Sequence, residues 1–61
     1  MEGLKSRIHE FLLKNRGKEF TVEEIAKAIN EERISVVKAQ LTRLVKEGKV
    51  LKVGVDKYKV I

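Results

Sequence analysis

Residues 37–50 read VKAQLTRLVKEGKV, and this stretch decides the fold. Apolar residues recur in it at three- and four-residue steps, which is the spacing of one face of a helix. They extend one turn upstream, so we predict a helix over residues 33–47. Gly48 ends this helix, because glycine readily takes the left-handed conformation that closes a helix. The predicted apolar stripe consists of Ile34, Val37, Leu41, Leu44 and Val45.

A β-hairpin is predicted downstream of this helix. Two runs rich in strand-forming residues, 49–53 and 58–61, flank a short break that contains Gly54. The alternation in the first run is imperfect, so either of its neighbouring apolar residues can face the core. Tyr58 is expected to pack in the core or at the base of the hairpin.

Two more helices are predicted upstream, over residues 3–15 and 22–29. The first has the apolar set Leu4, Ile8, Phe11 and Leu12, and the second has Val22, Ile25, Ala26 and Ile29. Thr21 and Glu24 form a capping box at the start of the second helix. The preceding residues 18–21 are expected to form an extended link.

The turn between the second and third predicted helices is Asn30-Glu31-Glu32. Asn30 tolerates a left-handed backbone and can end the second helix. The two glutamates are expected in the first turn of the next helix, where the helix dipole favours negative charge. Phe11 and Phe20 are expected in the core.

The length and composition of the chain exclude several classes of site and of protein. The chain has 61 residues, no cysteine and one histidine, so we expect one domain over residues 1–61 with no disulfide, no metal site and no cofactor. No apolar run can span a bilayer and no signal-peptide core is present, which favours a cytoplasmic protein. The 38% of charged residues, mostly lysine and glutamate, is typical of hyperthermophile proteins.

Positive charge is concentrated in the second half of the chain. The net charge is +5, and residues 33–61 hold eight basic residues against two acidic ones, whereas residues 1–32 hold six against seven. Such an asymmetry favours a polyanionic partner for the second half, although a merely solvated surface would look the same.

The predicted elements, the Ile25-Ala26 pair and the pattern V-x-x-x-L-x-x-L-x-x-x-G-x-V over residues 37–50 resemble the winged helix-turn-helix DNA-binding domain superfamily, here of the small archaeal-type transcriptional regulators. The resemblance covers essentially the whole chain. It implies an α+β fold, a winged helix-turn-helix of three helices followed by a C-terminal β-hairpin wing. It also implies a duplex DNA-binding protein, active in transcription regulation, whose third helix lies in the major groove.

The candidate DNA-binding residues follow from the exposed side of that helix and from the wing. They are Ser35, Val36, Lys38, Ala39, Gln40, Thr42, Arg43, Lys46, Lys52, Lys57 and Lys59. Arg43 can grip a guanine edge or a phosphate, Gln40 can read adenine, and Val36 can touch a thymine methyl. The lysines suit phosphates, since an ammonium acts as a point charge. The wing lysines also protect an exposed sheet edge from aggregation.

One other function is open. A winged helix can serve as a protein–protein interaction module of a transcription or replication assembly, and Val36 and Leu13 are the residues that favour this. An enzyme is not expected, because the sequence has no nucleophile–base pair, no metal set and no phosphate loop. A homodimer is compatible with the DNA-binding hypothesis, since one small module gives little specificity alone.

Overall fold

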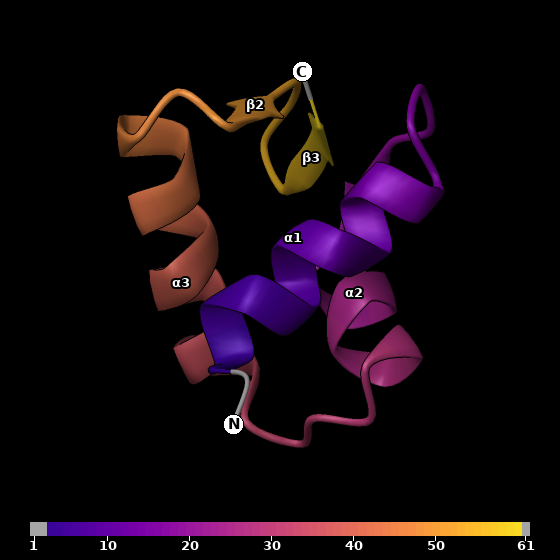
Figure 1. The fold of residues 1–61 in the computed structure, drawn as a ribbon. Helices are drawn as coiled ribbons and strands as arrows, with labels where there is room; N and C mark the ends of the chain where they lie inside the picture. The colour runs from indigo at the N-terminus through magenta and orange to yellow at the C-terminus, as the bar shows by residue number, and fades with distance from the viewer. Residues whose placement is uncertain (1–2, 61) are drawn as a thin grey trace.

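The computed structural model describes residues 3–60 and has the α+β architecture that the sequence predicts (Figure 1). Its elements, in chain order, are α1 (Leu4–Lys14), β1 (Phe20–Thr21), α2 (Val22–Ala28), α3 (Ile34–Lys46), β2 (Val50–Lys52) and β3 (Lys57–Val60). Each helix ends within one residue of its predicted bounds. The hairpin is also present, but the predicted extension of its second strand to residue 61 lies outside the described residues.

The extended link before α2 is part of the sheet. β1 pairs with β3 in antiparallel fashion, with Phe20 opposite Tyr58, so the sheet order is β1-β3-β2. β3 therefore lies in the middle and pairs on its other side with β2, where Lys52 is opposite Tyr58 and Leu51 is opposite Lys59. The sheet has three strands within the described residues, whereas the sequence predicted only the hairpin.

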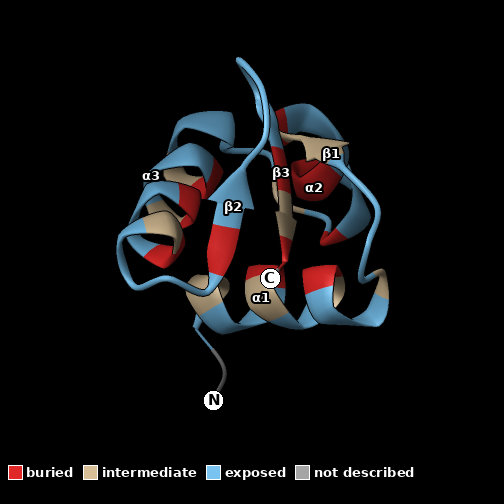
Figure 2. Cartoon of the chain, turned by 90° about the horizontal axis from the view of Figure 1, so that it is seen from above, coloured by how far each residue is buried: buried red, intermediate tan, exposed pale blue. Residues whose placement is uncertain are grey.

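The core lies where α1, α2, α3 and one face of the sheet meet, and Figure 2 shows the buried positions turned toward this space. Its members are Ile8, Leu12, Val22, Ile25, Ala26, Ile29, Val37, Leu41, Leu44, Val50, Tyr58 and Val60. Val50, and not Leu51, faces the core from β2. All buried side chains in residues 3–60 are apolar or aromatic. The removal of their apolar surface from water stabilises the fold.

Three sequence expectations about packing are corrected. Phe11 and Phe20 are only partly buried; they pack on each other at the margin of the core, with ring centroids 4.9 Å apart. Ile34, expected in the apolar stripe, is 39% exposed. It is the first residue of α3, and helical side chains point toward the N-terminus, so its side chain projects past the packed part of the helix.

The helix ends are set by local hydrogen bonds. The Thr21 hydroxyl accepts from the Glu24 amide at 3.1 Å, and the Glu24 carboxylate accepts from the Thr21 amide at 2.8 Å, which confirms the capping box. Asn30 and Gly48 have positive φ angles of 60° and 78°. The amide of the residue after each donates to a carbonyl five residues back, so α2 and α3 both end in a Schellman motif.

Glu31 and Glu32 lie before α3 and not in its first turn, which corrects the expectation from the sequence. Glu31 instead accepts hydrogen bonds from the backbone amide and the guanidinium of Arg33, at 3.1 and 3.2 Å. Arg33 holds the pKa of Glu31 below its ordinary value. The Glu31–Arg33 ion pair thus stabilises the turn immediately before α3.

Candidate nucleic-acid interface

The face of α3 that points away from the core is long and basic. Because Val37, Leu41 and Leu44 are buried at three- and four-residue steps, the residues on the opposite side face solvent. Ser35, Lys38, Ala39, Thr42, Arg43 and Lys46 are exposed there, whereas Val36 and Gln40 are half-buried. The structure therefore brings all the predicted helix residues onto one side of the molecule, with Val36 and Gln40 at its edge.

This face has two flanks. Residues three or four apart lie on the same flank of a helix. Lys38, Thr42 and Lys46 belong to the flank beside the hairpin, because they line a pocket together with residues of β2 and β3. Arg43 shares its flank with Glu47, which binds Lys5 of α1. Arg43 lies three residues before Lys46 but does not line this pocket, whereas Lys38 and Lys46 do.

The lysines of the hairpin are divided between the two faces of the sheet. Side chains alternate along a strand and directly opposite residues share a face. Lys52 lies opposite Tyr58, so it shares the face that looks toward α3. Lys59 lies opposite Leu51 on the outer face, and Lys57, two residues earlier, shares that face. The sequence treats the three as one set, but only Lys52 joins the residues of α3.

A pocket of about 240 Å³ lies between α3 and the hairpin. Its lining consists of Lys38, Thr42, Val45, Lys46, Lys52 and Tyr58. The Thr42 hydroxyl donates to the Lys38 carbonyl at 3.0 Å, so its proton is engaged within the helix. The Tyr58 hydroxyl makes no hydrogen bond to the described residues, and no buried side-chain polar atom among them lacks a partner. Tyr58 lines the pocket, and its hydroxyl is left without a partner among these residues.

Burial shifts the acidity of the tyrosine. The Tyr58 ring is 2% exposed, and this burial raises the pKa of its hydroxyl above the ordinary value of 10.0, with a smaller contribution from the negative charge of Asp56. At neutral pH the group is protonated and can donate a hydrogen bond to a ligand in the pocket.

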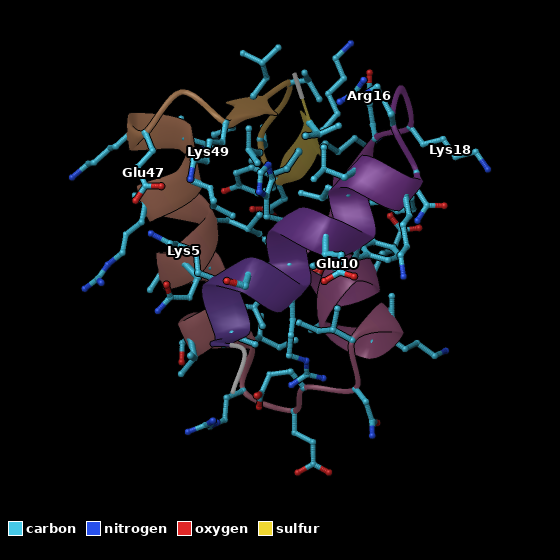
Figure 3. The ribbon with its side chains drawn as sticks, viewed as in Figure 1. Lys5, Glu10, Arg16, Lys18, Glu47 and Lys49 are labelled. Atoms are coloured by element: carbon cyan, nitrogen blue, oxygen red, sulfur yellow. The ribbon has the colours of Figure 1, made fainter. Side chains whose placement is uncertain are left out.

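Ion pairs neutralise other parts of the surface. Glu47 binds Lys5 at 2.6 Å and Lys49 at 3.6 Å, and Figure 3 shows both lysines converging on it from α1 and from the loop after α3. Lys5 is the main cause that lowers the pKa of Glu47. The remaining ion pairs within residues 3–60 are Glu10–Lys14 and Glu31–Arg33.

The predicted DNA-binding cations take no part in these pairs. Within the described part of the chain, no carboxylate lies within ion-pair distance of Lys38, Arg43, Lys46, Lys52, Lys57 or Lys59. Their charge is therefore uncompensated on the surface formed by α3 and the hairpin. The described residues contain no group of three or more metal-ligating side chains, and none of their helices is long and apolar enough to cross a membrane.

The sequence singled out the cations of α3 and of the hairpin but missed the pocket and the place of Tyr58 in it. The alternation of Tyr58 and Val60 could have placed Tyr58 on the core side, yet its register with Lys52 depends on the hairpin turn, which the sequence leaves open. Comparison with protein-family models, with curated proteins and with solved structures found no match for this chain.

Proposed function

We propose that this chain is a winged helix-turn-helix domain that binds duplex DNA, with α3 in the major groove and the hairpin as the wing. We further propose that it acts as a transcriptional regulator. The order of three helices, with β3 between β1 and β2, is compatible with such a domain. The function rests on the residues of the surface, because a fold alone does not name a ligand.

The observation that carries the proposal is the uncompensated positive charge on one exposed helix and the strand beside it. Double-stranded DNA presents a dense array of phosphates, and a protein that neutralises them gains affinity by releasing counterions. Lys38, Lys46 and Lys52 suit this role. The small side chains of Ser35 and Ala39 let the backbone of α3 approach the base edges.

Arg43 is the candidate for base recognition. It is exposed on α3, and a guanidinium can bond to both acceptors on the major-groove edge of guanine. Gln40 and Val36 are half-buried, which restricts their contribution to the margin of the contact. Lys57 and Lys59 face away from α3, so a duplex held against α3 meets Lys52 before it meets them.

A salt-titrated binding assay tests the function. We expect the affinity for duplex DNA to fall steeply with salt, with a slope of about 0.9 for each neutralised phosphate and about four to six phosphates in all. Candidate operator duplexes and a random duplex should share most of this slope and differ in absolute affinity. A slope near zero, or no binding at low salt, would remove the DNA-binding hypothesis.

One observation favours a second function, that of a protein-interaction module. Leu51 and Val53 are 44% and 37% exposed, and alternation places both on the outer face of the sheet, away from α3. Leu13 adds an exposed apolar side chain on α1, whereas the half-buried Val36 supports a protein contact less than the sequence suggested. Sedimentation of the chain and of its Leu51→Ser variant would show whether this face mediates self-association.

A further inference from the structure

We propose that the pocket between α3 and the hairpin is a binding site for a single phosphate group. Lys38, Lys46 and Lys52 surround the phosphate, and the Tyr58 hydroxyl donates a hydrogen bond to it. Occupation by a backbone phosphate of DNA rests on the proposed function, whereas occupation by a free phosphate does not.

The pocket gathers cations from two elements. Lys38 and Lys46 lie on the same flank of α3, two turns apart, with Thr42 between them. Lys52 enters from β2, directly opposite Tyr58 in the sheet. An anion in this pocket therefore meets three positively charged side chains in one place.

The size and the walls of the pocket suit a phosphate. Its volume of about 240 Å³ lies below the roughly 300–1,000 Å³ of ordinary small-molecule sites, and it accommodates a phosphate with part of its hydration shell. Val45 and the Tyr58 ring form an apolar wall. Such a wall keeps water from one side of the anion and strengthens its attraction to the lysines.

The other candidate sites on the surface lack this combination. A second pocket, of about 320 Å³ between α1 and the end of α2, contains Arg7 and Lys14 but also Glu10. Glu10 lies 3.7 Å from Lys14 and would repel an anion, while Arg7 donates to the Ile29 carbonyl. Lys57 and Lys59 do not line either pocket.

The first experiment uses inorganic phosphate, with ionic strength held constant by sodium chloride, and follows backbone amides by NMR. We expect saturable shifts centred on Lys38, Lys46, Lys52 and Tyr58. Lys52→Gln should weaken the binding of phosphate about fivefold, because it removes one of the three positive charges of the pocket. Lys27→Gln removes the same charge from the exposed side of α2, away from this pocket, and should change nothing.

A separate variant tests whether the Tyr58 hydroxyl donates a hydrogen bond to the phosphate. Tyr58→Phe keeps the buried ring, so the variant retains the packing, and it should bind phosphate several-fold more weakly. An unchanged affinity would remove Tyr58 as a donor. If the shifts spread over all lysines without saturating, or if Lys52→Gln behaves like Lys27→Gln, the phosphate site itself is wrong.

The second experiment repeats the comparison with duplex DNA. At about 0.1 M salt, Lys52→Gln should lower the affinity five- to tenfold and reduce the salt slope by about one contact, with Lys27→Gln as the control. Phosphate binding without DNA binding would support a free phosphate as the ligand and refute the proposed function. DNA binding with equal effects of the two variants, and no localised phosphate shifts, would refute the pocket and leave the function standing.

Discussion

Arg43 and the lysines beside it carry the same charge on α3 but differ in geometry. A guanidinium is a rigid fork that matches the edge of a base, whereas an ammonium is a flexible point charge. Arg43 also lies outside the lining of the hairpin pocket, to which Lys38 and Lys46 belong. In the proposed function, base recognition and backbone attachment belong to separate side chains of one helix.

The assignment of Arg43 predicts a selective loss. Arg43→Ala should cost about 1–3 kcal/mol of binding free energy on the preferred duplex and relax the preference at one base pair. Arg43→Lys, the matched control, should restore most of the general affinity but not the preference. Binding to preferred and random duplexes, measured side by side, checks this. An equal loss on both, with a lower salt slope, would make Arg43 a phosphate contact.

Gly48 shows how one residue fixes the end of α3. Its φ is +78°, and a Cβ built there would meet nothing within 4 Å. The cost of Gly48→Ala is therefore that of the left-handed backbone alone, about 1–2 kcal/mol of unfolding free energy. Gly54→Ala, at a glycine without a positive φ, should be close to neutral. Denaturant unfolding of both variants checks this, and equal stabilities would contradict the role of Gly48.

At the scale of the element, the phase of α3 decides which residues reach the surface. Leu41 is fully buried, so Leu41→Ala should lower the free energy of unfolding by about 2–5 kcal/mol. Leu51→Ala makes the same change at a position that is 44% exposed and should cost far less. Chemical unfolding followed by circular dichroism measures both. If Leu41→Ala unfolds like the parent, the phase of α3 and its proposed DNA-binding face are both wrong.

The elements differ in how far the sequence predicts them. Helix periodicity and caps are local signals, so α3, the capping box at Thr21 and the left-handed turn at Asn30 are all predictable. β1 is a two-residue strand whose partner lies far along the chain, and no local pattern reveals it. The division of Lys52 from Lys59 needs the register of the hairpin, which two adjacent apolar residues in β2 leave ambiguous.

At the scale of the whole molecule, the ion pair between Lys5 and Glu47 joins the first helix to the end of the third. The pKa of Glu47 is lowered from 4.5 in the folded chain, so the pair stabilises the fold above that pH. The stabilisation is lost as the pH falls through the lowered value. Lys49, the second partner of Glu47, adds to the same dependence.

The Glu47→Gln variant should therefore melt below the parent at neutral pH, and the difference in melting temperature should shrink as the pH falls below 4.5. Glu19→Gln removes the same charge at an exposed site that takes part in none of the ion pairs of residues 3–60. Melting curves from pH 7 to pH 2 provide the comparison. A difference for Glu47→Gln that is independent of pH would mean that the carboxylate charge does not support the fold.

The central place of β3 has a consequence for how the protein is made. β1 and β2 are neighbours of β3 and not of each other, so neither has a partner strand until residues 57–60 have left the ribosome. The helices also depend on distant contacts, since α1 packs against α3. The sheet therefore cannot form on either side of its centre until residues 57–60 are in place, whatever order the rest of the chain folds in.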